Sequence, residues 1–498
     1  MLAQTASHSA IYALGVLLNR AAGFLMLPLY TRYLTPADYG AVEMLFMTTE
    51  VFAMIASAGL YSAVFRFHAS APTEEARRTV VATSTLLFIG FYAVAALIGA
   101  ACAGPLATAL LPGVEYGDTL FRLIFLSFFL QSFIEIPSLY LRVLGLPWRF
   151  VATGAAKLAL QLVLNVLFLV ILDLRVLGVL YSTLLSSLAV GLVLLPWSLR
   201  RTGMRWDHVQ ARLLLIFGVP LILASLGNFA LTFGERYFLT TFAGLHETGI
   251  YALGYKLGMV LWVFAVMPLF TSWEAQRFEV AKRPDAAAIE ARTFLWFSLG
   301  VIGCALGLAL FARDFFRVMS APIFWEAHRI VPLIVLAYLL QAWTHFGNFG
   351  LLHSGRTRQL ATATALAALA MALACLWLVP RHGAMGAALA TLLAYALRFV
   401  LVWFAARRQY PMSLPWMRVN LSLLLAIGTW LVAASLRPDN LIESLLLNTL
   451  LLLGFSCAVA FSPLLGTTER RALRGLIERQ VQRVQPARGM TARPLSPS

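Results

Sequence analysis

The chain has 498 residues, of which 60% are hydrophobic and only 12% are charged. A soluble domain carries about 25% charged residues, so this composition leaves too little polar surface to cover a water-soluble globule of this size. The formal net charge of +16 must then be explained in a chain that lies mostly in lipid.

Apolar runs of membrane-spanning length follow one another along the whole chain. A bilayer core about 30 Å thick requires about 20 apolar residues per helix, and the backbone there must satisfy its own hydrogen bonds. We therefore predict an all-α integral membrane protein with about 14 transmembrane helices. The predicted spans are 9–33, 41–64, 80–103, 119–141, 151–171, 177–197, 213–242, 249–271, 293–312, 329–352, 359–379, 384–405, 420–436 and 444–464.

The basic residues are concentrated in alternate loops. With the N-terminus placed inside, 25 of the 38 Lys and Arg residues fall on the inner side and 5 on the outer side, and the others lie in or beside the spans. This bias predicts a multi-pass protein with both termini cytoplasmic. The basic excess then faces the anionic inner leaflet, which accounts for the net charge without nucleic acid.

A weak internal repeat appears when the chain is shifted by 209 positions. Asn19 then meets Asn228, and the turn at 37–40 meets the turn at 246–249. Six spans separate the two copies, so both begin on the same side of the membrane, as in transporters built from two parallel bundles. We predict two pseudo-symmetric six-helix lobes, residues 1–208 and 209–415, and an extra C-terminal helix pair at 416–466.

The remaining segment, residues 467–498, is predicted to be a basic cytoplasmic tail. Its apolar residues between 473 and 484 recur near helical spacing and are flanked by arginines. This pattern is typical of an amphipathic helix that lies on the inner leaflet.

Polar side chains inside the predicted spans are the best functional candidates. A charge in a spanning helix costs about 2.5–3.5 kcal/mol on insertion scales, so it usually faces a cavity or a partner. Arg20 is either a cavity cation that meets an anionic substrate or one half of a salt bridge with Glu50. Lys157, Gln161 and Asn165 share one helix face. That polar stripe either lines water or forms hydrogen bonds with neighbouring helices.

Four later spans carry further candidates. Glu235 and Arg236 are adjacent in the seventh span and point about 100° apart, so they cannot pair neatly with each other. Lys256 lies in the eighth span and Arg398 in the twelfth. His345, in the tenth span, is either a titrating group or a hydrogen-bonded core residue.

Cations outnumber acids among the deepest of these charges, which predicts a cationic cavity suited to a phosphate-bearing or otherwise acidic substrate. The predicted substrate-binding residues are Asn19, Arg20, Arg32, Lys157, Gln161, Asn165, Arg236, Lys256 and Arg398. The predicted charge partners or coupling groups are Glu50, Glu135, Glu235 and His345. The sequence has no phosphate-binding loop or HExxH motif, and its four cysteines are widely spaced, so we expect no catalytic set, no metal and no cofactor.

Two stretches carry a family resemblance. The first is Leu18–Arg20 followed by Pro28–Gly40, and the second is Gly234–Leu239 followed by Gly249–Leu257. Both resemble the bacterial oligosaccharide flippases of O-antigen and polysaccharide biosynthesis. The family more often has Asp where this chain has Glu235.

The resemblance implies the multidrug/oligosaccharidyl-lipid/polysaccharide exporter superfamily, whose two lobes open alternately to the two sides of the membrane. It implies a flippase, not an enzyme, that moves an undecaprenyl-diphosphate-linked oligosaccharide from the cytoplasmic to the periplasmic leaflet of the bacterial inner membrane. Lipopolysaccharide O-antigen and exopolysaccharide are the expected products of such a pathway. The implied partners are this lipid-linked glycan, membrane lipids and other polysaccharide-assembly membrane proteins.

Three alternatives stay open at this point. A lipid II flippase would share the fold, and the helix pair within 420–464 is compatible with a lipid groove. A multidrug or cation antiporter of the same superfamily would require cavity acids to dominate. A membrane glycosyltransferase would require long external loops with paired acids, and the sequence lacks these.

Overall fold

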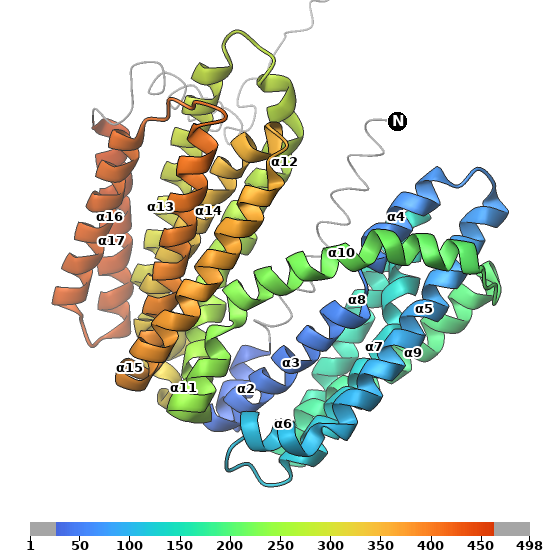
Figure 1. Ribbon diagram of the computed structural model, residues 1–498. Helices are drawn as coiled ribbons and strands as arrows, with labels where there is room; N and C mark the ends of the chain where they lie inside the picture. Colours follow the sequence, from blue (N-terminus) through green and yellow to red (C-terminus); the bar gives the residue numbers. More distant parts are fainter. Residues whose placement is uncertain (1–25, 463–498) are drawn as a thin grey trace, which may run out of the picture. The chain divides into compact units, whose positions relative to one another are not determined.

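The computed structural model describes residues 26–462, and all of their regular structure is helical (Figure 1). The α-helices are α2 Leu27–Tyr33, α3 Pro36–Ala56, α4 Leu60–Ser70, α5 Glu74–Ala101, α6 Ala103–Leu110, α7 Gly117–Val143, α8 Pro147–Asn165, α9 Arg175–Thr202, α10 His208–Phe233, α11 Glu235–Val260, α12 Met267–Val280, α13 Ala286–Met319, α14 Val331–His353, α15 Thr357–Arg407, α16 Trp416–Leu436 and α17 Leu441–Phe461. Two π-helical segments, η1 Val166–Ile171 and η2 Leu261–Val266, and the 3-10 helix η3 Pro322–Arg329 complete the set.

The chain forms two compact units. In the described part of the chain, the first contains residues 26–268 together with Ala312–Pro411, and the second contains Leu269–Phe311 and residues 412–462. The first unit therefore holds α2 to α11, α14 and α15, whereas α16, α17 and most of α12 and α13 belong to the second. The predicted lobes come from the sequence repeat and not from the contacts that define these two units. Their boundaries stay a prediction.

The predicted multi-pass membrane fold is confirmed. Ten helices in the described residues are long and apolar enough to cross a bilayer, and the bent pair η3–α14 raises the number to 11. The stretch 208–271 counts as one of the ten although its 64 residues would reach roughly 96 Å as a straight helix, enough for two crossings. The 51-residue helix α15 is likewise long enough for two. Most of the first predicted span, 9–33, and the whole basic tail lie outside the described residues.

Local sequence signals set several helix ends and breaks. Thr35 and Asp38 form a reciprocal capping box at the start of α3, and the Asp207 carboxylate accepts hydrogen bonds from the first amides of α10. Gly59, with a φ of 64°, separates α3 from α4. Gly383, with a φ of 51°, breaks α15 between two predicted spans.

Within the first unit, α7 packs against both α5 and α9, and the three helices run side by side in Figure 1. Aromatic side chains fill the seam between α5 and α7: Tyr92 stacks on Phe88 and on Phe128, with ring centroids 4.2 and 4.4 Å apart. Elsewhere in this unit, α11 packs against α3, α14 and α15. Helix α11 therefore joins the first and second halves of the predicted repeat.

The crossing of α3 and α11 depends on two glycines. A Cβ at Gly40 would meet the carbonyl oxygen of Leu245, and a Cβ at Gly249 would meet the carbonyl oxygen of Pro36. Leu245 and Gly249 lie 209 positions after Pro36 and Gly40, respectively. The shift of 209 positions in the predicted repeat therefore exchanges the two sides of this contact. Such an exchange is expected where a pseudo-two-fold axis passes between two copies. Small residues let the backbones approach this closely.

The second unit has its own buried polar contacts. Arg277 and Glu290 form an ion pair at 3.5 Å, with side chains only 3% and 2% exposed. The Asn448 amide of α17 donates a hydrogen bond of 3.1 Å to the Leu310 carbonyl of α13. These bonds tie α17 to α13 and the end of α12 to the start of α13.

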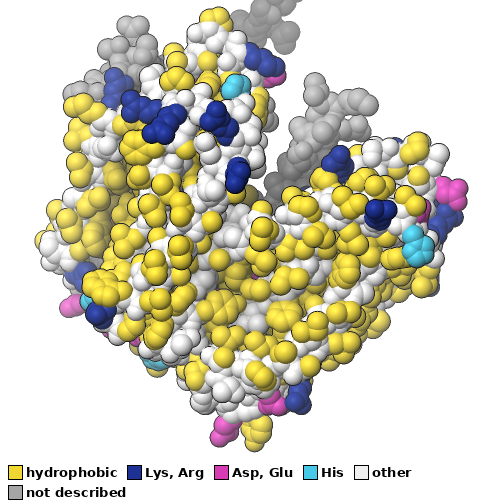
Figure 2. Space-filling model, viewed as in Figure 1, with side chains coloured by type: hydrophobic (Ala, Val, Ile, Leu, Met, Phe, Trp, Pro, Cys, Tyr) yellow, Lys and Arg dark blue, Asp and Glu magenta, His cyan; other side chains and the backbone are white. Residues whose placement is uncertain are grey.

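The outer surface agrees with a lipid environment. Large apolar side chains such as Leu97, Val193 and Leu223 are more than two-thirds exposed. On the face drawn in Figure 2, hydrophobic side chains cover the flanks of the helices, and Lys and Arg gather toward their ends. This distribution follows the hydrocarbon and headgroup layers of a bilayer.

Candidate functional site: charged residues at the α3–α11 contact

A set of charged residues lies where α3 meets α11. Lys256 of α11 donates a hydrogen bond of 2.9 Å to the Tyr39 hydroxyl of α3, and its Nζ lies 5.3 Å from the centre of the same ring. One turn along α3, the Glu43 carboxylate lies 3.6 Å from the Lys256 Nζ. The Lys256 side chain is 26% exposed and that of Glu43 is 10% exposed, so the lysine retains access to the space outside the contact.

Arg236, also on α11, adds a second cation to this set. Its guanidinium lies over the rings of Phe233 and Tyr255, 4.8 and 4.6 Å from their centres, and approaches the Met47 sulfur of α3 at 3.6 Å. The residue is 2% exposed. In the described part of the chain it forms no ion pair, and its Nε has no hydrogen-bond partner. Among residues 26–462, aromatic faces and one sulfur therefore surround this charge, and no carboxylate forms an ion pair with it.

The adjacent Glu235 is fully buried and has a separate set of contacts. Its carboxylate accepts a hydrogen bond of 3.1 Å from the Tyr251 hydroxyl, which also lies 3.3 Å from the Thr391 hydroxyl of α15. The second carboxylate oxygen has no partner among residues 26–462. Glu235 and Arg236 thus do not bond to each other, as their positions on the helix predict.

The predicted polar stripe on α8 is directed at neighbouring helices. Lys157 donates to the Gln131 side chain of α7 at 2.5 Å, and Gln161 donates to Thr183 of α9 at 3.3 Å. Asn165 is fully buried and donates to the Tyr30 hydroxyl of α2 at 3.2 Å. These contacts are of the kind expected for inter-helix bonding, whereas a role of the stripe in substrate binding stays a prediction.

Gln131 connects Lys157 to an acid. Its amide oxygen accepts from Lys157, and its amide nitrogen donates to the Glu135 carboxylate at 2.6 Å. Glu135 in turn lies within electrostatic range of Glu50 on α3. The structure therefore brings Lys157, Glu135 and Glu50 together, and the Gln131 amide lies between Lys157 and Glu135.

Arg398 and His345 lie in another part of the first unit. Arg398 of α15 donates a hydrogen bond of 3.0 Å to Gln341 of α14 and is 6% exposed. The His345 ring lies 5.1 Å from the Trp262 ring of η2, edge to face. Neither of these two contacts involves Lys256, Tyr39 or Glu43.

Three predicted residues fall at the start of the chain. Asn19 and Arg20 lie outside the described residues. Arg32 lies in the last turn of α2 and is exposed. Glu43, by contrast, is missing from the sequence-based set. It lies inside the predicted span 41–64, two residues from its start, and only its position opposite Lys256 distinguishes it from an acid at the membrane interface.

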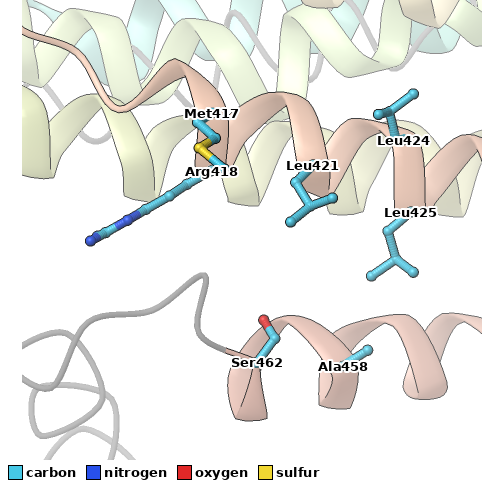
Figure 3. A pocket seen from close by; sticks show the side chains of 7 residues that line it. All are labelled: Met417, Arg418, Leu421, Leu424, Leu425, Ala458 and Ser462. Carbon is cyan, nitrogen blue, oxygen red and sulfur yellow. The ribbon is translucent and has the colours of Figure 1, made fainter.

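An apolar groove of about 750 Å³ lies in the second unit, between α16 and α17. Leu421 and Leu425 point from α16 toward Ala458 of α17 and Ser462, the residue that follows α17, and the Arg418 side chain extends at the end where Ser462 lies (Figure 3). An apolar trough with a guanidinium at one end has the chemistry to hold an alkyl chain with an acidic head.

A comparison with protein families identifies the chain. The family described as polysaccharide biosynthesis protein matches residues 6–273, more than half of its length. The chain belongs to this family. A search of curated protein sequences found no match.

Solved structures show the same fold for this member of the polysaccharide biosynthesis family. The lipid II flippase MurJ in an inward closed conformation gives a TM-score of 0.71 at 12% identity, covering 94% of this chain and 100% of MurJ. A multidrug resistance MATE transporter of the MOP superfamily gives 0.62 in its inward-facing and 0.52 in its outward-facing conformation, at 17% and 18% identity. These two alignments cover 81% and 83% of this chain and 95% and 96% of the transporter chains. Family and fold together place the chain among multi-pass membrane proteins of polysaccharide biosynthesis.

Proposed function

We propose that this protein is a flippase that moves an undecaprenyl-diphosphate-linked oligosaccharide from the cytoplasmic to the periplasmic leaflet of the bacterial inner membrane. The polymer served would be a surface polysaccharide, such as lipopolysaccharide O-antigen or an exopolysaccharide. The observation that carries the proposal is the pair Arg236 and Lys256, two cations on one membrane-embedded helix of a polysaccharide biosynthesis protein.

The chemistry of a diphosphate fits this pair. Hydrogen bonds between a cation and a phosphate oxygen are shorter and about twice as strong as neutral ones, and they replace the water that the phosphates lose on leaving the cytoplasm. Lys256 is the cation with access to substrate because a quarter of its side chain is exposed. Arg236 is shielded by aromatic rings and contributes mainly through its field. The lipid tail stays in the bilayer while the glycan crosses between the lobes.

The wider arrangement belongs to the same proposal. The lobes at 1–208 and 209–415 rock about the α3–α11 contact in an alternating-access cycle, and the pair 416–466 and the tail 467–498 are additional segments of the same chain. Both termini face the cytoplasm, as the arginine distribution predicts. The other predicted substrate-binding residues supply further polar contacts to the substrate. They are Asn19, Arg20, Arg32, Lys157, Gln161, Asn165 and Arg398. Glu50, Glu135, Glu235 and His345 are the candidates for ion coupling or charge balance.

A lipid II flippase is the second candidate, since lipid II is also a polyprenyl diphosphate and the groove between α16 and α17 is compatible with either substrate. Its apolar lining and the Arg418 guanidinium suit a polyprenyl diphosphate whichever sugar it carries. A cation antiporter fits less well, because Lys256 and Arg236 would repel a cationic drug.

Lipid analysis of a deletion strain tests the proposal and separates the two candidates. Build-up of one undecaprenyl-diphosphate oligosaccharide in extracted lipids, with loss of surface polysaccharide, is the expected result. Build-up of lipid II would favour the second candidate. Unchanged lipid-linked glycans together with intact surface polysaccharide would reject both, and altered sensitivity to cationic drugs would then support an antiporter.

A further inference from the structure

We propose that Glu43 is an internal counter-ion, which holds the phosphate-binding position of Lys256 while the transporter is empty and leaves it when a diphosphate binds. The inference rests on the proposed function, since it concerns the same cationic site. It assigns a role to an acid that the sequence alone did not single out.

The geometry places Glu43 as a competitor for one particular atom. The Lys256 Nζ carries three N–H groups, one of which is bonded to the Tyr39 hydroxyl at 2.9 Å. The Glu43 carboxylate lies 3.6 Å away, beyond the 2.7–2.9 Å that is usual for an N–H to carboxylate hydrogen bond. Attraction of charge holds this pair, without a short hydrogen bond.

A pair of this kind is suited to exchange. A phosphate oxygen can approach the free N–H groups of Lys256 to full hydrogen-bond distance, whereas Glu43 does not. Tyr39 keeps its own bond to the lysine and so fixes the position of Nζ while the anionic partner changes. A diphosphate and Glu43 carry the same sign of charge, so both cannot lie close to Nζ at low cost.

The exchange also links substrate to the contact between the lobes. Glu43 is on α3 and Lys256 is on α11, two helices that cross at the paired glycines and that the repeat assigns to different lobes. Their ion pair therefore ties the two lobes across the crossing. When a diphosphate replaces Glu43, the tie is released and α3 is free to move relative to α11.

The same residue matters after the substrate has left. Arg236 has no ion pair in the described part of the chain, and Glu43 lies within electrostatic range of both Arg236 and Lys256. An empty site without Glu43 would leave Lys256 without its ion-pair partner while Arg236 lies within electrostatic range, and the repulsion between these two cations would oppose closure. Glu43 thus favours the return of the empty transporter.

Binding and export measurements on matched variants test this role. The purified protein in lipid nanodiscs is titrated with undecaprenyl diphosphate, and export of glycan is measured in cells. We expect Glu43→Gln to bind the lipid about tenfold more tightly, within the range of typical coupling between two sites, and yet to export more slowly. The control Glu75→Gln removes one negative charge from an exposed ion pair with Arg205 and should change neither value.

Two further variants complete the design. Glu43→Asp keeps the charge but shortens the side chain, so it should bind with intermediate affinity even if Glu43→Gln folds poorly. The double variant Glu43→Gln/Lys256→Gln should lose the gain in affinity, because the gain acts through Lys256.

The outcomes distinguish the two levels of the argument. If Lys256→Gln weakens binding while Glu43→Gln does not strengthen it, the counter-ion role is wrong and the cationic site stands. If neither wild type nor any variant binds undecaprenyl diphosphate, the proposed function fails and the counter-ion role fails with it. Tighter binding by Glu43→Gln together with export at the wild-type rate would refute the role of Glu43 in the return of the empty transporter.

Discussion

Replacing Gly40 with Ala tests whether α3 and α11 cross as closely as the structure shows. The added Cβ would overlap the Leu245 carbonyl oxygen and lie 3.1 Å from the Gly249 backbone nitrogen. Both are backbone atoms, so no rotamer change relieves the overlap and the helices must separate. Overpacking of this kind costs about 1–3 kcal/mol, and the better helix propensity of Ala offsets up to about 1 kcal/mol. We expect a net loss of about 1–2 kcal/mol.

The reciprocal substitution provides a second arm. Gly249→Ala should cost a similar amount because its Cβ would overlap the Pro36 carbonyl oxygen. The double variant should cost less than the sum, since the first Cβ has already moved the helices apart. The control is Gly90→Ala on α5, where nothing lies within 4 Å of the added atom.

The assay is thermal unfolding of the purified variants, followed by tryptophan fluorescence and by size-exclusion chromatography after heating. Gly40→Ala and Gly249→Ala should melt below wild type, and Gly90→Ala at or above it. Equal melting temperatures for Gly40→Ala and Gly90→Ala would refute the close crossing. Strict additivity of the two costly substitutions would refute the shared contact.

Three further predictions concern stability and topology. Arg277→Met should destabilise the protein by about 3–5 kcal/mol in thermal unfolding because it removes the guanidinium that forms an ion pair with the buried Glu290 carboxylate, and Arg277→Met/Glu290→Leu should recover most of that loss; an equal loss in both would contradict this. Gly383→Ala should cost about 1–3 kcal/mol, because its φ of 51° is strained for a residue with a Cβ, and wild-type melting would show that α15 does not break there. In a cysteine-free background, Arg201→Cys should react with an impermeant reagent only from the cytoplasmic side and Glu115→Cys only from the periplasmic side; the reverse pattern would invert the orientation.

The sequence by itself was sufficient for the fold class because hydropathy is a local property. A run of about 20 apolar residues must be helical in lipid wherever it lies in the chain. The two-lobe repeat stays a prediction from the sequence, in which Gly40 and Gly249 lie 209 positions apart.

The candidate cations could be picked in the same way. Lys256 and Arg236 are unusual in spans that are otherwise apolar, so each is conspicuous without knowledge of its neighbours. The sequence could not tell which of the polar residues meet. Lys157 and Gln161 occupy one helix face as predicted, but their bonds to α7 and α9 depend on which helices lie beside them.

Only the tertiary structure decided the partners. Glu43 lies 213 positions from Lys256 in the sequence, and nothing local to either residue specifies the other. Their ion pair exists because two glycines allow α3 and α11 to cross at backbone contact, which brings side chains that are distant in the sequence close together. The sequence determined that charges must be compensated in lipid, and the packing of the helices determined which residue compensates which.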